Sequence, residues 1–531
     1  MVAQWNFGRD VMDGWAASHP QGAALYLLRD FARADTVSFA ELRAVTNRLA
    51  SRFRQAGVQP RDRVAVVVGK DPAFWPIMVA LIKLGAVPMP GTTQLTPRDI
   101  GYRLALSDAH LVIANSETAA RVAADPDLSA AIRVGWVVGG ESPTPAWSRL
   151  DPFHDESGDP DDPGNPTDEG DPCLLYFTSG TTGHPKMVLH THTYPRAHRI
   201  TGVDWIGLRP GDIHWNLSDT GWAKAAWSSL FGPWMAGATV VVDPMAGRFN
   251  ARAMLQYLAG HPITSICAAP TIYRMLVQED LSSYALAHLR SAVGAGEPLN
   301  PEVIDAFRRA TGLTIRDGYG QTETVLLVGN RPGAPVKPGS MGKPSRGFDV
   351  DVIDEAGERL PADREGDIAV WMGDAPPEGL YQGYWRDDAE TASRRRGPWY
   401  ITGDRAVRDE EGYLWFVGRA DDVILSAGYR IGPFEVESAL VEHPAVMEAA
   451  VVSSPDALRG EIVKAFVILA PGVEPSDALV ADLQEHVKSV TAPYKYPRAI
   501  DFVDELPKTI SGKIRRVELR DREWRREPPT L

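Results

Sequence analysis

The sequence predicts an α/β protein in which a large N-terminal domain of helix-covered sheets precedes a small α+β domain. The chain has 531 residues, which is too long for one ordinary core and indicates two or more domains. Short apolar runs alternate with helix-like stretches over residues 36–150, a pattern that favours a parallel sheet covered by helices. A composition break near residues 418–422 sets off a last stretch of about 110 residues, enough for a small domain.

The elements of the first part follow one another in the expected order. The runs RVAVVVG (63–69) and HLVIA (110–114) are typical of buried strands, and AFWPIMVALIKLGA (73–86) between them is typical of a helix. Residues 151–172 are rich in acidic residues, proline and glycine, so we expect a solvated connector there.

The part beyond the break mixes strand and helix patterns. In DALVADLQEHVKSV (477–490), Leu479, Leu483, Val487 and Val490 recur at helical spacing. The other expected elements are the strands VILSAG (423–428), AAVVSS (449–454) and KAFVILA (464–470) and the helix FEVESALVEHP (434–444).

Composition argues against several classes of function. The net charge of −14 disfavours a broad nucleic-acid or membrane-surface role, since both favour a basic face. Cys173 and Cys267 are too few for a metal cluster or a disulfide framework, and such low use fits a reducing cytosol. We expect neither a signal peptide, because the first 15 residues lack an apolar core, nor a membrane span, because no run of 18 apolar residues occurs.

A glycine- and hydroxyl-rich loop, TSGTTGHPK (178–186), follows the apolar run CLLYF (173–177). Its glycines let the backbone approach an anion, its hydroxyl and N–H groups can donate hydrogen bonds, and Lys186 supplies a positive charge. The loop lacks the Gly-Lys of GxxxxGK[ST], because Pro185 precedes Lys186, and no GxGxxG follows a strand here. It is therefore a candidate polyphosphate site of another type.

Five further motifs follow this loop in a fixed order. They are GAGEPL (294–299), DGYGQTET (317–324), YITGD (400–404), GRADDVILSAGYRIGPFEVES (418–438) and PKTISGKIRR (507–516). Together with the loop they resemble the adenylate-forming superfamily over nearly the whole chain. Within it the chain looks most like the medium-chain acyl-CoA synthetases, on the segments SDTGW (218–222), TIYRML (271–276) and KSVTAPYKYPR (488–498).

The resemblance implies an AMP-forming acyl-CoA synthetase with two half-reactions. A carboxylate and ATP would give acyl-AMP and pyrophosphate, and acyl-AMP and coenzyme A (CoA) would then give the thioester and AMP. Lys513 is implied to act on the reacting carboxylate and α-phosphate, Lys186 on the β- and γ-phosphates and Thr322 on the α-phosphate, while Glu323 would bind Mg²⁺. The residues implied to bind ATP are Thr178, Ser179, Gly180, Thr181, Thr182, Gly183, Lys186, Gly296, Glu297, Pro298, Asp317, Gly318, Tyr319, Gly320, Gln321, Thr322, Asp404, Arg419, Arg430 and Lys513.

The second half-reaction is implied to need rotation of a mobile C-terminal domain. The implied domains are residues 1–417 and 423–531, with residues 418–422 as the hinge and Asp421 at the hinge position. The residues implied to contact CoA are Gln94, Ser426, Ala427, Gly428, Tyr429, Arg459 and either Lys488 or Ser489. Ala427 departs from the serine of many relatives, so only a backbone contact is expected there.

The acid itself stays open at this stage. Acetate-activating relatives carry a tryptophan where this chain has Gly320, so the resemblance implies a larger acid: a straight medium chain, a branched short chain or an aromatic acid. The residues implied to wall the acyl pocket are Trp222, Lys224, Trp227, Cys267, Ala268 and Gly320. Lys224 is costly to bury without a partner, so it is either a pocket lysine or one that reaches the surface.

Three other functions compete with this interpretation. They are an adenylating enzyme that loads a carrier protein, a luciferase-like oxygenase and a non-enzymatic nucleotide binder. The spacing of Pro507 and Gly512-Lys513 resembles a site of lysine acylation, which predicts a lysine acetyltransferase as a partner acting on Lys513. We further expect a cytoplasmic protein and allow for a homodimer.

Overall fold

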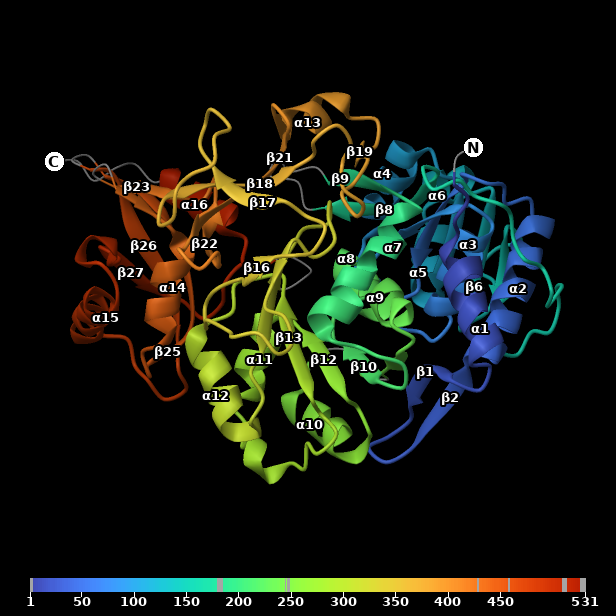
Figure 1. The fold of residues 1–531 in the computed structure, drawn as a ribbon, viewed down its shortest axis with the longest axis horizontal. Coiled ribbons are helices and arrows are strands. Elements are labelled where there is room, and N and C mark those ends of the chain that lie inside the picture. Colours follow the sequence, from blue (N-terminus) through green and yellow to red (C-terminus); the bar gives the residue numbers. More distant parts are fainter. Residues whose placement is uncertain are drawn as a thin grey trace.

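The protein is described by a computed structural model of residues 3–178, 185–243, 245, 249–426, 429–456, 459–508 and 513–525. Figure 1 shows the N-terminal third of the chain on the right, the middle third at the lower centre and the C-terminal part on the left. Among these residues, no helix is long and apolar enough to cross a membrane.

The first sheet has five parallel strands in the order β4-β3-β5-β6-β7, which confirms the parallel sheet predicted for residues 36–150. Its strands are β3 (Arg63–Val67), β4 (Val87–Pro90), β5 (Leu111–Asn115), β6 (Val134–Val138) and β7 (Trp147–Leu150). The helices of this part are α1 (Gly14–Ser18), α2 (Phe39–Gln55), α3 (Phe74–Lys83), α4 (Pro97–Ser107), α5 (Ser116–Ala123) and α6 (Pro126–Ala131).

Helix α3 is buried along its whole length, and its last residue is a lysine. The Lys83 side chain is 0% exposed, and its ammonium donates to Asp13 Oδ1 at 2.6 Å and to Asn47 Oδ1 at 2.5 Å. A buried charge is tolerated only when it is paired and hydrogen-bonded. These two contacts therefore fix the start of the chain and α2 against α3.

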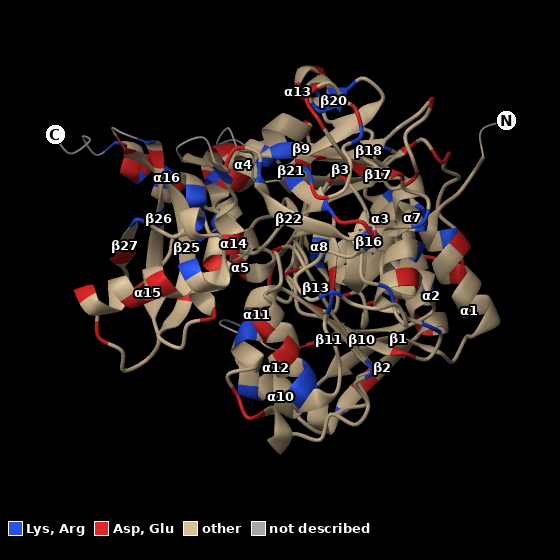
Figure 2. Ribbon diagram, turned by 60° about the vertical axis from the view of Figure 1, so that its left-hand side comes forward, with Lys and Arg blue, Asp and Glu red and all other residues tan. Residues whose placement is uncertain are grey.

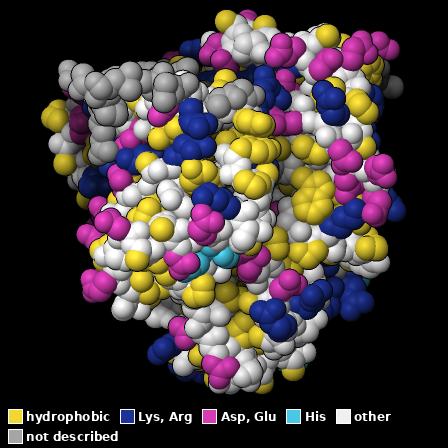
Figure 3. Space-filling view, turned by 90° about the vertical axis from the view of Figure 1, so that its left-hand side faces the viewer, with side chains coloured by type: hydrophobic (Ala, Val, Ile, Leu, Met, Phe, Trp, Pro, Cys, Tyr) yellow, Lys and Arg dark blue, Asp and Glu magenta, His cyan; other side chains and the backbone are white. Residues whose placement is uncertain are grey.

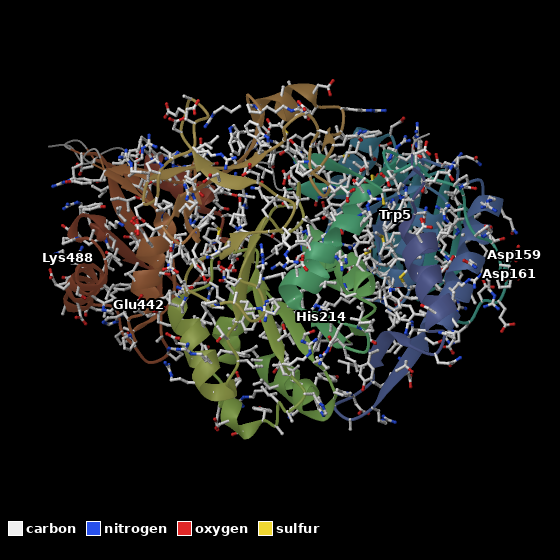
Figure 4. The ribbon with its side chains drawn as sticks, in the orientation of Figure 1. Trp5, Asp159, Asp161, His214, Glu442 and Lys488 are labelled. Carbon is white, nitrogen blue, oxygen red and sulfur yellow. The ribbon has the colours of Figure 1, made fainter. Side chains whose placement is uncertain are left out.

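The connector of residues 151–172 is a loop, as its composition predicts, and most of its residues are exposed or partly exposed. It has no helix, but it packs along α2, where the guanidinium of Arg54 pairs with the buried carboxylate of Asp162 at 2.7 Å. Only part of its acidic run faces outward, and Figure 4 shows Asp159 and Asp161 at the outer edge of the molecule. Its contact with α2 was not predicted, because the arginines that hold the connector lie in a distant helix.

The second sheet has nine strands in the order β16-β15-β14-β13-β12-β10-β11-β1-β2 and positions the site. Its middle strands, from β14 to β1, run parallel. The pairs β1–β2, β14–β15 and β15–β16 are antiparallel. Figure 1 shows α10 (Ala251–Gly260), α11 (Pro270–Leu276) and α12 (Pro301–Thr311) beside it. The strands are β1 (Ala23–Leu28), β2 (Ala34–Ser38), β10 (Ile213–Asn216), β11 (Thr239–Val242), β12 (Ser265–Ala268), β13 (Ser291–Ala295), β14 (Arg316–Tyr319), β15 (Val328–Gly329) and β16 (Lys343–Pro344).

One apolar core joins the two sheets. Phe231 of α9 (Phe231–Met235) contacts Phe7 edge-on at 4.8 Å between ring centroids, and both belong to the core cluster that includes α3. Trp75 of α3 donates its indole N–H to the carbonyl of Ser229 at 2.6 Å. The helices α7 (Thr193–Arg199), α8 (Ala223–Ala225) and α9, with a π-helical turn (Ala226–Leu230), belong to this central region.

Two smaller sheets complete the N-terminal part. One has the order β19-β9-β8, and the other has β17-β18-β21-β20 with β22 paired to β21. Their elements are β8 (Pro172–Thr178), β9 (Lys186–Thr191), β17 (Val350–Ile353), β18 (Glu365–Trp371), β19 (Gly383–Tyr384), β20 (Arg395–Arg396), β21 (Trp399–Arg408), β22 (Leu414–Arg419) and the helix α13 (Asp388–Ser393).

The C-terminal part forms its own sheet, in the order β24-β23-β26-β25 with β27 beside β26. The predicted helix matches α15 (Asp477–Val490), in which Leu483 and Val487 are buried but Val490 is exposed. The fold class predicted from the sequence is thus confirmed. The remaining elements are β23 (Ile424–Ser426), β24 (Tyr429–Ile431), β25 (Val446–Asp456), β26 (Gly460–Leu469), β27 (Ala499–Phe502), α14 (Pro433–Val441) and α16 (Arg516–Trp524).

Polar contacts join the C-terminal part to the rest of the chain. Asn300, which precedes α12, donates its side-chain amide to the hydroxyl of Ser438 on α14 at 2.8 Å, and both residues are buried. Arg520 of α16 donates to the backbone carbonyl of Asp421 and lies 3.3 Å from the carboxylate of Asp422. Two separate elements of the C-terminal part therefore hold it in its orientation.

Charge is intermixed on the surface rather than gathered in one patch of a single sign. Figure 2 shows Lys and Arg interspersed with Asp and Glu on α12, α15 and α16. Figure 3 shows the same mixture on the face that the C-terminal part presents. Positive charge in the candidate site comes from individual side chains.

Candidate functional site

The site lies at the carboxyl ends of the central strands of the nine-stranded sheet. β12, β13 and β14 are parallel neighbours, so the residues that end them meet at one edge. In α/β sheets this edge is where ligands bind, because the loops that leave the strands open there. Cys267, Ala295 and Asp317 are brought together in this way, as the motif order predicts.

Asp317 is a buried carboxylic acid within β14. Its Oδ1 accepts the N–H of Gly318 at 2.9 Å, and burial raises the pKa of this carboxyl group to about 8. The N–H bond and the charge of Lys224 act in the opposite direction. An acid in this state can donate as well as accept a hydrogen bond near neutral pH.

Asp404 on β21 receives hydrogen bonds from two residues of the DGYGQTET motif. Its Oδ2 accepts from the Tyr319 hydroxyl at 2.6 Å and from the Gln321 side-chain amide at 2.7 Å. Burial raises the pKa of Asp404, while the positive charges of Arg419 and Lys513 lower it. Arg419 lies opposite Asp404 in the ladder that pairs β21 with β22. The structure thus brings these five predicted residues together.

Lys513 reaches this region from the far end of the chain. Its charge lowers the pKa of Asp404 on one side and the pKa of Lys224 on the other. The ammonium of Lys513 is therefore within electrostatic reach of both the nucleotide motifs and the predicted acyl pocket. This is the placement that its predicted role requires.

Thr322 and Glu323 are held by residues that the motifs do not contain. Thr322 O lies 2.7 Å from His190 Nε2, so this nitrogen carries the proton, because a carbonyl oxygen only accepts. Glu323 Oε1 accepts from the hydroxyl of Tyr384 on β19 at 2.7 Å, and the Glu323 carbonyl accepts the N–H of Tyr381.

The carboxylate of Glu323 fits the usual Mg²⁺ arrangement. Within the described part of the chain, His, Cys, Asp and Glu side chains form no cluster of three or more that could hold a metal. Mg²⁺ is commonly bound by one or two carboxylates together with phosphate oxygens and water, so a single carboxylate suffices.

Lys186 begins β9 opposite Thr178, the last residue of β8. Its ammonium pairs with the carboxylate of Glu390 on α13 and lies 5.4 Å from the centroid of the Tyr384 ring. Arg394 donates to the same carboxylate oxygen of Glu390 at 3.0 Å. Lys186 thus already has an anionic partner inside the protein. The predicted residues Ser179, Gly180, Thr181, Thr182 and Gly183 lie outside the described residues.

Lys224 is partly buried, and its ammonium points inward instead of extending to the surface. Its ammonium donates to the carbonyl of Ala295, and a Cβ added at Gly296 would lie 2.7 Å from it. Burial lowers the pKa of Lys224, and the same burial raises the pKa of the nearby thiol of Cys267. Glycine at position 296 is favoured by its positive φ of 103°, and it also leaves room for the end of the Lys224 side chain.

Gly320 faces an aromatic ring. A Cβ built at this position would lie 2.3 Å from Cη2 of Trp227. The space that glycine leaves at position 320 is therefore shared with the Trp227 indole, a partner that sequence reasoning did not assign. Trp222 immediately precedes α8, and Ala268 ends β12 and is fully buried.

The residues predicted to contact CoA are spread over several surfaces in this orientation. Gln94 lies between β4 and α4, Ser426 ends β23, and Tyr429 of β24 is exposed, as is the neighbouring Arg430, which was predicted to bind ATP. Figure 4 shows Lys488 of α15 at the outer edge of the C-terminal part. Arg459 directly precedes β26 and is exposed. Ala427 and Gly428 lie outside the described residues. The structure does not gather this set around the site.

Sequence reasoning missed the residues that support the motif side chains. His190, Tyr384 and Glu390 contact Thr322, Glu323 and Lys186 from outside every motif. An available signal was Glu390 itself, an acidic residue just ahead of the basic run RRR (394–396).

Comparisons with known proteins give a consistent result. The model of the family "AMP-binding enzyme" matches residues 12–385, and "AMP-binding enzyme C-terminal domain" matches residues 435–513. The protein named "Acyl-coenzyme A synthetase ACSM3, mitochondrial" from Homo sapiens is 46% identical over 530 residues, covering 98% of this chain and 90% of that protein. "Acyl-coenzyme A synthetase ACSM5, mitochondrial" from Homo sapiens is 44% identical over 529 residues, covering 98% and 91%.

Two solved structures share the whole architecture. The anthranilate CoA ligase AuaEII in complex with anthranoyl-AMP superposes with a TM-score of 0.89 and 31% identity, covering 99% of this chain and 98% of that one. A benzoate CoA ligase from Burkholderia xenovorans LB400 gives a TM-score of 0.83 and 28% identity, covering 97% and 100%.

Proposed function

This chain belongs to the family of AMP-binding enzymes, and we propose from that premise that it is an AMP-forming acyl-CoA synthetase. It activates a carboxylic acid larger than acetate with ATP and then transfers the acyl group to CoA. One observation carries the proposal. Asp404 accepts hydrogen bonds from Tyr319 and Gln321 at 2.6 and 2.7 Å opposite Arg419, at the same end of the sheet where Lys224 of the predicted acyl pocket donates to Ala295.

In the first half-reaction a carboxylate oxygen attacks the α-phosphorus of ATP. The new P–O bond forms as the bond to the pyrophosphate oxygen breaks, and acyl-AMP and pyrophosphate result. Lys513 reduces the repulsion between the two anions, while Asp404 accepts from the ribose hydroxyls and Thr322 contacts the α-phosphate. The hydrogen bonds from Tyr319 and Gln321 hold the Asp404 carboxylate in place for this role.

In the second half-reaction the CoA sulfur attacks the acyl carbonyl carbon. The bond from that carbon to the AMP oxygen breaks, AMP leaves, and the thiol proton passes to solvent. We propose that residues 423–531 rotate about residues 418–422 between the steps, which carries Lys513 away and brings the 426–430 segment to the site. Residues 418 and 419 belong to β22, so the backbone change falls next to Asp421, where β22 has ended.

Mg²⁺ belongs to this proposal as a cofactor. Glu323 would hold it, and the bound cation would neutralise phosphate charge. The Tyr384 hydroxyl of β19 donates to Glu323 Oε1 at 2.7 Å. This hydrogen bond orients the carboxylate that would bind the cation.

Replacing Glu390 by glutamine is expected to strengthen ATP binding. Glu390 holds the ammonium of Lys186, so incoming phosphates must compete with this carboxylate for it. The amide removes the competing charge at nearly unchanged volume. We expect the Kd of Mg-ATP to fall by about 3- to 10-fold, or ~0.7–1.4 kcal/mol, in a calorimetric titration.

Glu378→Gln is the matched control. Glu378 pairs with Arg196 and not with Lys186, the lysine predicted to bind the phosphates. Removing the Glu378 charge should therefore leave the Kd of Mg-ATP unchanged. Weaker ATP binding in Glu390→Gln would contradict the competition and show that Glu390 positions Lys186 for the phosphates.

The function itself is tested by identifying products. The protein is incubated with Mg-ATP, CoA and a panel of short, branched, medium-chain and aromatic acids, and a parallel reaction omits CoA. We expect acyl-CoA and AMP with CoA present, and acyl-AMP in its absence. Acyl-AMP that never reaches CoA would favour the alternative, an adenylating enzyme that loads a carrier protein.

Four finer predictions extend the proposal. The acid is proposed to be a straight medium-chain, a branched short-chain or an aromatic acid. Lys513 is proposed as a target of a lysine acetyltransferase, since acylation would remove the charge that adenylation needs. A homodimer is proposed as well. A cytoplasmic location stays a prediction, and the relatives above are named as mitochondrial proteins.

A further inference from the structure

The segment that carries Lys513 is tied to the C-terminal part by an ion pair with two hydrogen bonds. Arg516 begins α16, three positions after Lys513, and its guanidinium meets the carboxylate of Glu437 on α14. Arg516 Nε donates to Glu437 Oε1 at 2.9 Å, and Arg516 Nη2 donates to Glu437 Oε2 at 2.6 Å. A contact with two parallel hydrogen bonds fixes both the distance and the direction of the guanidinium.

Glu437 is a firmly held partner for this arginine. It is 6% exposed, and its Oε1 also accepts the backbone N–H of Val451 on β25 at 2.8 Å. Val436 and Leu440 of the same helix lie with Val451 in the apolar core of the C-terminal part. The carboxylate therefore has one defined position, because a buried charge depends on its hydrogen bonds and its partner.

The far end of α16 is anchored without Arg516. Leu519 is buried in a second small core, and the indole N–H of Trp524 donates to Ser453 Oγ at 3.1 Å. Loosening Arg516 should therefore leave α16 docked and affect its first turn, which adjoins Lys513.

The chain around Lys513 turns back on itself just before α16. Lys508 and Ile514 form an antiparallel bridge, and the N–H of Arg515 donates to the carbonyl of Pro507 at 2.8 Å. Residues 509–512 lie outside the described residues. Position 513 is thus inside a closed segment, and Arg516 ties the end of this segment to α14.

The ion pair adjoins the contact between α14 and the N-terminal part. Ser438 follows Glu437 in the sequence, and its hydroxyl accepts the side-chain amide of Asn300 at 2.8 Å. Asn300 directly follows the GAGEPL motif, three residues of which are predicted to bind ATP. A short path of contacts therefore runs from this motif through Asn300, α14 and Arg516 to the segment of Lys513.

Three carboxylates act on Arg516 in this orientation. Burial disfavours the charge of the guanidinium, while the carboxylates of Glu437, Asp422 and Glu297 raise its pKa above the ordinary value. Glu297 belongs to the N-terminal part, so its attraction for Arg516 would be lost if residues 423–531 rotate. The charge of Arg516 thus favours the orientation in which Lys513 faces the nucleotide motifs.

We propose that Arg516 is a positioning residue for the first half-reaction, and that its ion pair with Glu437 places the ammonium of Lys513 against the reacting anions. The effect is confined to acyl-AMP formation, because the second half-reaction follows the proposed departure of Lys513 from the site. A misplacement of about 1 Å can cost about 10²-fold in rate, so a partial loss of fit at Arg516 is measurable. The inference rests on the proposed synthetase function.

Arg516→Lys tests this placement. It keeps a positive charge beside Glu437 but replaces the two-pronged contact by a point charge. At saturating ATP and acid we expect the rate of acyl-AMP formation to fall by about 10-fold, with the KM of either substrate changed by less than about 2-fold. Thioester formation from supplied acyl-AMP should fall by less than about 3-fold.

Arg515→Lys is the matched control. Arg515 is the adjacent residue, is 51% exposed and pairs with Glu518 at 3.0 Å. Both half-reactions should stay within about 2-fold of the unmodified enzyme, as expected for an exposed pair.

A double variant shows whether Arg516 acts through Lys513. In Lys513→Ala the ammonium to be positioned is absent, so adding Arg516→Lys should change the residual rate of acyl-AMP formation by less than about 2-fold. A further loss of about 10-fold in that background would overturn the proposal, because Arg516 would then act independently of Lys513.

Glu437→Gln is the second variant if Arg516→Lys does not fold. It weakens the same ion pair from α14, keeps an oxygen that can accept the N–H of Val451, and should give the same selective loss of acyl-AMP formation.

The remaining outcomes separate this inference from the function on which it rests. An unchanged rate of acyl-AMP formation in Arg516→Lys, or an equal loss of both half-reactions, would overturn the inference and leave the synthetase function intact. A lack of acyl-AMP and acyl-CoA from every acid with the unmodified enzyme would overturn the proposed function itself.

Discussion

Lys513→Ala is expected to lower the rate of acyl-AMP formation by about 10²–10³-fold, the scale for one transition-state contact. The charge of Lys513 reaches both Asp404 and Lys224, so its loss removes positive charge from the place where two anions react. The second half-reaction uses a neutral acyl carbonyl and a thiol. Thioester formation from supplied acyl-AMP should therefore fall by less than about 3-fold.

Single-turnover assays measure the two half-reactions separately. Lys508→Ala is the control, because Lys508 lies near Lys513 in the sequence but pairs with Glu448 on the surface at 2.8 Å. It should leave both rates within about 2-fold, as expected for an exposed pair. An equal loss of both half-reactions in Lys513→Ala would show that the lysine supports the fold or CoA binding.

Asp13→Ala is expected to destabilise the N-terminal part by about 3–5 kcal/mol, the cost of leaving a buried charge without its partner. Lys83 is 0% exposed and donates to Asp13 and Asn47, so the variant keeps a buried ammonium that has lost its carboxylate. Urea unfolding followed by tryptophan fluorescence measures the change, since Trp75 and Trp234 lie in the same core.

Two further variants separate this charge effect from other losses. Asp35→Ala should cost less than about 1 kcal/mol, because Asp35 pairs with Arg29 at the surface and is 63% exposed. The double variant Asp13→Ala with Lys83→Met removes both charges and should recover most of the stability. A double variant as unstable as Asp13→Ala would mean that packing, and not charge, holds this region.

Local patterns predicted those parts of the fold that depend on neighbours in the sequence. The apolar runs of residues 63–69 and 110–114 became β3 and β5, and the helical spacing of residues 477–490 matches α15. Periodicity decides these elements, because the strand and helix repeats are properties of one short segment. The motif order likewise placed Asp317, Asp404 and Lys513 in one site.

Contacts between distant segments could not be predicted in this way. Lys186 and Glu390 pair across 204 positions, and the fold alone brings β9 beside α13. The contact of Gly320 with the Trp227 ring was not predicted either, because that ring comes from a different helical turn. Composition correctly predicted a loop for residues 151–172, but it did not predict that arginines of α2 hold the acidic run.

If residues 423–531 rotate as proposed, the polar contacts that hold them in the present orientation help to set how far each orientation is populated. Asn300–Ser438 and Arg520 with Asp421 are hydrogen bonds, each worth about 1 kcal/mol net. A change of 1.4 kcal/mol shifts a two-state population about tenfold. Ligands that bind one orientation slightly better than the other can therefore reverse the balance. Under the proposed rotation, one substitution at Ser438 would shift the ratio of the two orientations in the absence of ligands.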